Sequence, residues 1–245
     1  MISKTRMTEL VKQLAWKDVA KGLDENPKLV GYRDERGRNW LHLCCSINLP
    51  DHPKLKAADS IKLASLLLDR GFGIDAPAFT ESGGTWHATP LWFAIGRGRN
   101  LALAEFLLKR GCNPNHCLWA AGFANDLDAI RLLAKHGAVI DAGHEDGTPL
   151  MGAIGWSRFA VAKVLLDLGA DVDQLDKSGD TALHKMLKKD SEKEHFRMIV
   201  AHGARGDIRN KKGETAAEIM ARKRDPEFKA LASKLKKAHK GPGPA

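Results

Sequence analysis

Two cysteines and a histidine stand close enough together in this sequence to suggest a metal site. Cys112 and Cys117 flank His116, and thiolate and imidazole groups are ligands that Zn²⁺ prefers. However, the spacing matches neither a C-x-x-C pair nor a zinc-finger pattern, and the other two cysteines, Cys44 and Cys45, are distant in sequence. We therefore expect no metal and no other cofactor.

Common catalytic and nucleotide-binding motifs are missing from the sequence. It contains no G-x-x-x-x-G-K-[ST] loop, no H-E-x-x-H helix motif and no G-x-S-x-G nucleophile motif. The glycine-rich stretch 96–99 lies in a predicted turn between two helices. Asp34, Asp146 and Asp176 recur where loops are predicted, which indicates turn chemistry rather than paired catalytic carboxylates. We expect no enzymatic activity.

The residues discussed above lie in or near a sequence unit that occurs several times in the chain. Its clearest copy spans residues 146–180. Thr148 can cap a helix through its hydroxyl, and Pro149 suits the first helical position because it has no N–H to lose. Apolar residues at helical spacing then predict two short helices. Gly169 stands where a left-handed residue closes the second helix.

The chain repeats this unit at a nearly constant period. Thr181-Ala182-Leu183-His184 restarts it 33 residues after Thr148, and Thr215 restarts it 34 residues later. The period and the T-P-L-H-like start resemble the ankyrin repeat over about residues 10–235. The resemblance implies an all-α fold, an ankyrin repeat solenoid of about seven helix-turn-helix units with short β-hairpin-like fingers.

The repeat pattern predicts a single array, 8–235, with modified ends, because a terminal unit faces solvent on one side. Residues 1–7 are expected to be flexible, and 236–245 to be a disordered tail. The unit that starts after Asn115 lacks a finger. The expected segments are a divergent N-terminal cap at 8–33, repeats at about 34–75, 76–115, 116–141, 142–175 and 176–208, and a C-terminal cap at 209–235.

The resemblance gives several reactive side chains structural roles. His42 and His184 occupy the histidine position of the T-P-L-H start, whose side chain hydrogen-bonds within the repeat framework in this family. Cys112 stands where the repeat usually has alanine, and Cys44 and Cys45 occupy its Ala-Ala position. We expect these cysteines to be small buried residues.

The resemblance also implies binding of another protein in a concave groove. The two residues after the Ala-Ala pair point into that groove in the family. Aromatic residues stand at these positions in the middle of the chain and basic residues in its C-terminal part, a combination that suits a protein interface. The aromatic rings can instead pack between first helices, and the basic residues can form a solvated face. The candidate site residues are Arg97, Phe123, Trp156, Lys188, Lys189, Arg222 and Lys223.

A second candidate surface lies at the base of the longest predicted finger, at Trp86 and His87. The missing finger after Asn115 should leave a notch beside it. Either function or sequence drift explains this irregularity.

The net charge of +9 is concentrated towards the C-terminal end. Residues 176–245 carry 18 Lys and Arg against 10 Asp and Glu, whereas 1–175 carry 21 against 20. This asymmetry predicts an acidic protein partner and salt-sensitive binding. The alternative is weak, sequence-independent binding of nucleic acid, although that region lacks interleaved aromatic residues.

No apolar run approaches the roughly 18 residues of a membrane span, and the N-terminal residues lack a secretory signal pattern. We therefore expect a cytoplasmic monomer that does not contact membranes. Stand-alone ankyrin proteins resemble inhibitors, adaptors and toxin-neutralising immunity proteins, and we expect one of these roles.

Overall fold

A computed structural model describes residues 1–78, 88–115, 117–143 and 147–237. These residues form fourteen α-helices in seven consecutive pairs, which confirms the predicted all-α repeat fold. Antiparallel bridges join Ala78 to Ala88 and Arg209 to Thr215 at the bases of two fingers. The helices pack into two compact units, one of Met1–Ala124 with Lys135–Ala138 and the other of Asn125–Ala134 with Val139–Ala245.

The first unit contains α1 to α7. Its helices are α1 (Lys4–Lys12), α2 (Trp16–Glu25), α3 (Trp40–Cys45), α4 (Ala57–Asp69), α5 (Pro90–Gly96), α6 (Leu101–Lys109) and α7 (Cys117–Ala124), with 3-10 turns at Pro27–Gly31 and Leu49–Asp51. The first helices α3, α5 and α7 pack in succession, and α4 packs against both α2 and α6. The loop between α3 and α4 contains the 3-10 turn at Leu49–Asp51.

The first helix starts earlier than the sequence suggests. The Ser3 hydroxyl accepts a hydrogen bond from the Arg6 N–H at 3.1 Å, so the helix begins at Lys4 and Thr8 lies inside it. Met7 is fully buried. The prediction that residues 1–7 are flexible is therefore wrong for Lys4–Met7, because the N-cap Ser3 starts the helix inside this segment.

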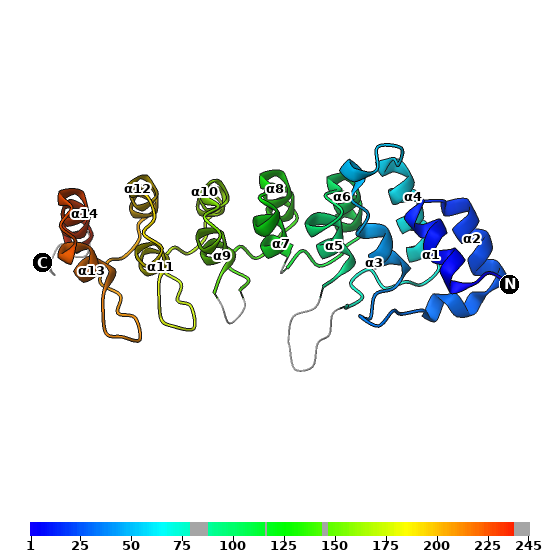
Figure 1. Cartoon of the computed structure of the whole chain (residues 1–245), viewed down its shortest axis with the longest axis horizontal. Helices are drawn as coiled ribbons and strands as arrows, with labels where there is room; N and C mark the ends of the chain where they lie inside the picture. The colour runs from blue at the N-terminus through cyan, green and yellow to red at the C-terminus, as the bar shows by residue number, and fades with distance from the viewer. Residues whose placement is uncertain (79–87, 116, 144–146, 238–245) are drawn as a thin grey trace, which may run out of the picture. The chain divides into compact units, whose positions relative to one another are not determined.

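The second unit contains most of α8 (Leu127–Lys135) and the three following pairs. These pairs are α9 (Pro149–Gly155) with α10 (Phe159–Asp167), α11 (Ala182–Lys188) with α12 (Lys193–Ala201), and α13 (Ala216–Arg222) with α14 (Pro226–Lys237). Within this unit, α9, α11 and α13 form one row and α10, α12 and α14 a second, and the fingers project from the side of the first row (Figure 1).

Histidines tie consecutive repeats together within each unit. His42 Nε2 lies 2.8 Å from the carbonyl oxygen of Ala76, and His184 Nε2 lies 3.1 Å from that of Glu214. Both carbonyls belong to the finger of the following repeat. These contacts confirm the predicted structural role of the two histidines.

Three finger loops share one hydrogen-bonding pattern. The first side chain of each loop accepts backbone N–H groups two and four residues later, as Asp176 does from Ser178 and Asp180 at 2.8 and 3.0 Å. Asp34 and Asn210 make the corresponding contacts in their loops. A positive-φ glycine completes each turn, at Gly37, Gly179 and Gly213. The turn role predicted for Asp34 and Asp176 is confirmed, and Asp146 lies outside the described residues.

Aspartates provide a further link between repeats. Asp75 accepts a hydrogen bond from the Asn113 N–H at 3.0 Å, and Asp173 accepts one from the Arg205 N–H at 2.8 Å. Asp141 does the same for the Asp171 N–H at 3.0 Å. Each bond spans about one repeat. It joins the loop that follows the second helix of one repeat to the corresponding loop of the next repeat.

The connection between α6 and α7 is much shorter than the others. It runs from Lys109 to Cys117, whereas the connection between α10 and α11 runs from Asp167 to Ala182. No full finger fits into the shorter connection. The predicted truncation of the repeat after Asn115 therefore agrees with the helix boundaries.

Candidate functional site

The predicted site residues stand where each first helix turns into its second helix. Arg97, Trp156, Lys189 and Lys223 are the C-cap residues of α5, α9, α11 and α13. Phe123 lies in the last turn of α7. Left-handed residues in these turns help the chain to reverse: Arg99, Asn125, Ser157 and Asp190, with φ between 46° and 56°.

In the first unit, Phe123 exposes 65% of its surface. A ring this exposed is not packed inside the core, which argues against the alternative that it fills space between first helices. Arg97 is exposed at the end of α5, and its guanidinium carbon lies 5.7 Å from the centre of the Phe93 ring. Both predicted residues are therefore on the surface of this unit.

In the second unit, Trp156 is half-buried. Its backbone N–H donates to the carbonyl of Gly152 at 2.9 Å and closes α9. A side chain on the preceding Gly155 would meet no atom within 4 Å, so there is open space beside this turn. Trp156 thus combines a packing role with a surface that a partner can reach.

The four predicted basic residues of this unit all bind groups of their own chain. Lys188 pairs with Asp180, and Lys189 donates to the carbonyl of Gly155. Arg222 pairs with Glu214 at 2.7 Å. Lys223 pairs with Asp190 at 2.9 Å, and its ammonium lies 4.7 Å from the centre of the Phe228 ring.

These internal pairs change the electrostatics of the predicted rim. Burial opposes ionisation of Asp180, but hydrogen bonds from Lys188 and Asn210 outweigh it and hold the pKa of Asp180 below its usual value. Asp180 is therefore ionised at neutral pH and neutralises Lys188. An acidic partner would have to compete with such carboxylates, so the rim attracts it less than its lysine count suggests.

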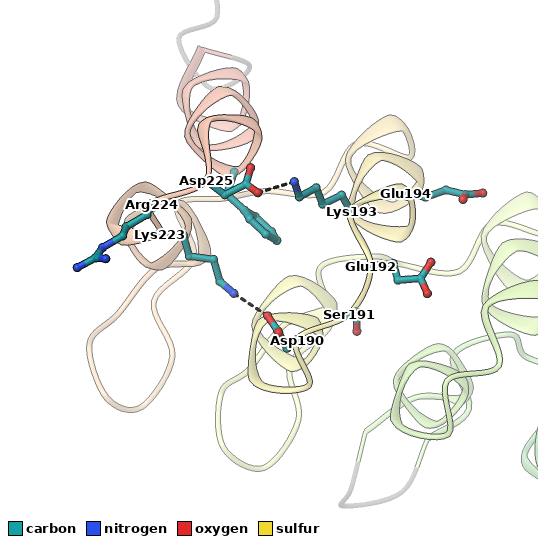
Figure 2. Close-up of a pocket in the computed structure, with 9 residues that line it drawn as sticks. Asp190, Ser191, Glu192, Lys193, Glu194, Lys223, Arg224 and Asp225 are labelled. Carbon is teal, nitrogen blue, oxygen red and sulfur yellow. Dashed lines mark hydrogen bonds and ion pairs between the residues drawn. The ribbon is translucent and has the colours of Figure 1, made fainter.

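A surface hollow of about 660 Å³ was not predicted from the sequence. It lies between the α11–α12 turn and the α13–α14 turn. Figure 2 shows that Lys193 reaches Asp225 and Lys223 reaches Asp190, so two ion pairs connect the two turns. Phe228 also lines the hollow and is 5% exposed. Because each lysine has a carboxylate partner, the contacts explain how the repeats are joined.

Sequence reasoning also missed two tryptophans. Trp92 and Trp119 are each the third residue of a first helix, which is where His42 and His184 stand in α3 and α11. Both are half-buried. The replacement of the repeat histidine by tryptophan was a signal that could have identified them.

The four cysteines, which include those of the metal candidate, are buried. Burial raises the pKa of Cys44 and Cys117 to about 12, so these thiols stay protonated. No cluster of three potential metal ligands occurs among the described residues. Trp86, His87 and His116 lie outside those residues. Across the described part of the chain, no helix is long and apolar enough to cross a membrane.

Comparisons with known proteins give one consistent match. The model of ankyrin repeats in three copies matches residues 91–176. Ankyrin repeat and SOCS box protein 6 of Pongo abelii is 34% identical over 128 residues, which cover 46% of this chain but only 30% of that protein. The similarity is thus to a segment of a longer relative.

Two solved structures are similar over almost the whole chain. The ankyrin repeat domain of human ASB11 has a TM-score of 0.66 and 23% identity, and covers 99% of this chain and 100% of that one. The ankyrin repeat domain of Bcl-3, a member of the IkappaB protein family, has a TM-score of 0.70 and 18% identity, and covers 95% and 100%. At these identities the likeness shows the fold.

Proposed function

Because this chain is an ankyrin repeat protein, we propose that it binds a protein partner, without catalysis, at the ends of its first helices. Ankyrin repeat domains generally mediate protein–protein interaction, and their fold is typically non-catalytic. The observation that carries the proposal is the 65% exposure of Phe123 at a helix end, because exposed aromatic side chains are common anchors of protein interfaces.

An acidic partner is supported by the excess of basic residues in 176–245. In this proposal Trp156 supplies an apolar contact in the second unit, and Phe123 supplies one in the first unit. The basic residues Lys188, Lys189, Arg222 and Lys223 contribute a weaker, salt-sensitive attraction, because each also binds a group of its own chain. The role proposed is that of an inhibitor, adaptor or immunity protein, and the chain acts as a monomer before it meets its partner.

The test compares an aromatic anchor with a basic rim residue. A partner captured from the native source is purified, and its affinity is measured for the parent, Trp156→Ala and Lys189→Ala. Truncating a central anchor typically costs about 2 kcal/mol, or roughly 30-fold in affinity, and a rim lysine far less. If Trp156→Ala and Phe123→Ala each stay folded and each bind the partner with the parental affinity, binding at these helix ends is refuted.

We also propose a cytoplasmic location. All four cysteines are free and buried, which is the state expected in a reducing compartment. Localisation of a tagged chain in the native source tests this, and recovery from an oxidising compartment would contradict it.

A further inference from the structure

The first unit carries a surface hollow of about 670 Å³ close to the N-terminus. Residues from the start of α1 line it together with residues of the 3-10 turn at Pro27–Gly31 and of the segment that follows this turn. We call it the N-terminal hollow. None of the candidate residues at the ends of the first helices lines it, so it is a separate surface of the molecule.

Contacts to the core hold the walls of the N-terminal hollow in place. The side-chain amide of Asn26 donates to the carbonyl oxygen of Ile2 at 3.3 Å, which joins the end of α2 to the residues before α1. The buried Trp40 donates through Nε1 to the carbonyl oxygen of Leu29 at 3.0 Å. Its ring also stacks on the Tyr32 ring, with 4.1 Å between the ring centres. The hollow is therefore shaped by the fold.

The charged side chains that line the N-terminal hollow all have the same sign. They are Lys4, Lys28 and Arg33, all exposed, and no described Asp or Glu is among the lining residues. The hollow between the α11–α12 and α13–α14 turns is different, because carboxylates in its lining pair with its lysines. The walls of the N-terminal hollow thus leave its positive charge without compensation.

The contacts of the three cations leave donors for an anion. Lys4 Nζ lies 5.6 Å from the centre of the Tyr32 ring, and one guanidinium nitrogen of Arg33 donates to the Tyr32 carbonyl at 2.8 Å. A guanidinium has five N–H donors, so Arg33 keeps several others. The carboxylate next to it in sequence, Asp34, pairs with Arg38 at 2.7 Å. Within the described part of the chain, no carboxylate forms an ion pair with Lys4, Lys28 or Arg33.

Helix stability does not account for a lysine at position 4. Lys4 is the first residue of α1, where the helix dipole disfavours a cation, and the first turn of this helix has no acidic residue. Lys193 is likewise the first residue of α12, but it pairs with Asp225. An anion bound in the N-terminal hollow would give Lys4 the partner that Lys193 finds within the chain.

The lining indicates the class of anion. A phosphate monoester carries about −1.5 to −2 charges at pH 7, so three cations favour it over a single carboxylate. Arginine and lysine both bind phosphate oxygens, the arginine with a planar fork. Small-molecule sites enclose most of their ligand and are mainly apolar, whereas the cations of this hollow are exposed. This openness suits a phosphate group that projects from a larger molecule.

We propose that the N-terminal hollow binds a phosphorylated side chain of a protein, with the phosphate on Lys4, Lys28 and Arg33. The half-buried Tyr32 ring contacts the residues beside the phosphate. This is a second binding site, and it does not depend on the binding proposed at the ends of the first helices.

The probes are pools of short fluorescein-labelled peptides, random except for a central phosphoserine, phosphothreonine or phosphotyrosine, and matching pools with the unphosphorylated residue. Fluorescence polarisation measures their affinity for the full chain at an ionic strength of about 0.15 M. At least one phosphorylated pool should bind about tenfold more tightly than its unphosphorylated match. A variant that combines Lys28→Gln with Arg33→Gln should lose this preference.

The matched control combines Lys12→Gln with Lys21→Gln, which removes two exposed lysines of α1 and α2 that do not line the hollow. It lowers the net charge equally and should keep the preference. Both variants replace exposed side chains, so their melting temperatures should equal that of the parent. Equal binding of phosphorylated and unphosphorylated pools, or equal loss in the control, would overturn the site.

Free adenosine monophosphate tests whether the phosphate must belong to a protein. We expect it to bind more weakly than the preferred peptide pool. If it binds as tightly, the ligand is a free phosphate ester and the assignment to a protein side chain is wrong. Binding at the ends of the first helices is tested separately by Phe123→Ala and Trp156→Ala, so the two proposals can fail independently.

Discussion

Asn39 and Thr181 occupy the same N-cap position before a repeat histidine, but their side chains make different hydrogen bonds to that histidine. Thr181 places its hydroxyl oxygen 2.9 Å from His184 Nδ1, to which it can donate. Asn39 accepts the His42 N–H with its amide oxygen at 3.1 Å. The same oxygen also faces His42 Nδ1, which accepts the Asn39 backbone N–H, so two acceptors lie together, and the Asn39 amide nitrogen is buried without a hydrogen-bond partner. A buried donor without a partner lowers stability. This cap is therefore a local weakness at the start of α3.

We predict that Asn39→Thr stabilises the protein. A threonine hydroxyl can accept the His42 N–H and donate to Nδ1, and no amide donor remains buried. The gain in unfolding free energy should be about 1 kcal/mol, measured by urea denaturation at pH 7. Asn39→Ala is the control and should destabilise, because it removes the cap. A threonine variant less stable than the parent would contradict this account.

His42 should make stability depend on pH. Burial lowers the pKa of His42 to about 4, against an ordinary value of 6.5. The unfolded chain thus binds a proton more readily, so the stability contributed by neutral His42 is complete above pH 6.5 and is lost as the pH falls towards 4. The slope should approach about 1.4 kcal/mol per pH unit. Urea denaturation of the parent and of His42→Gln between pH 7 and pH 4.5 measures it, and equal slopes would be inconsistent with a neutral buried histidine.

Among the elements, the loops after the second helices are joined by Asp75, Asp141 and Asp173. Burial raises the pKa of all three carboxyls despite the backbone N–H that each accepts. In Asp141 one carboxylate oxygen binds the Asp171 N–H, whereas the other is buried without a partner. Its negative charge is therefore not needed for the contact.

We predict opposite effects for two substitutions of Asp141. Asp141→Asn keeps an oxygen for the Asp171 N–H and removes a disfavoured charge, so it should be at least as stable as the parent at pH 7. Asp141→Ala loses the bond and should cost about 1 kcal/mol. Because the raised pKa favours the protonated carboxyl in the folded state, the difference between parent and Asp141→Asn should shrink as the pH falls. An asparagine variant as unstable as the alanine variant would show that the charge is required.

The helices were predictable because their signals are local. The T-P-L pattern and apolar spacing around α9 and α10 give caps and core positions directly, and Leu165 is buried as that spacing requires. The partners of Lys189 and Lys223, the Gly155 carbonyl and the Asp190 carboxylate, were not predictable, since they lie 34 and 33 positions away and depend on helix packing. Trp92 was not predicted as a site residue, because the reason why it can replace the repeat histidine lies in the short connection between α6 and α7.

For the whole molecule, the net charge counted from the sequence differs from the number of basic residues that are not engaged in ion pairs. The excess of 18 basic over 10 acidic residues in 176–245 suggests a strongly attractive end, yet ion pairs such as Arg222–Glu214 and Lys223–Asp190 engage many of these cations. The carboxylates offset part of the charge, and an excess of eight basic residues (18 − 10) remains in this segment. The expectation that residues 8–235 work as a single array stays a prediction.

We predict weak binding of duplex DNA by the full chain. The dissociation constant should be about 10⁻⁴ M or weaker near physiological salt and should rise steeply between 50 and 200 mM salt, because only counterion release drives such binding. Fluorescence polarisation with a labelled 20-base-pair duplex of random sequence measures it, with the same titration on Lys211→Glu as the control. Micromolar affinity that persists at high salt would favour the nucleic-acid alternative.

The bonds between consecutive fingers also determine how the second unit responds to pulling. The Lys211 N–H donates to the carbonyl of Ser178, and His184 and Asp173 add their links to the same neighbouring repeat. A force applied at the two ends of this unit loads such links in series, so every junction carries the same force and the weakest one yields first. Because each repeat is stabilised mainly by its neighbours, we expect the second unit to lengthen under force by opening one helix pair at a time.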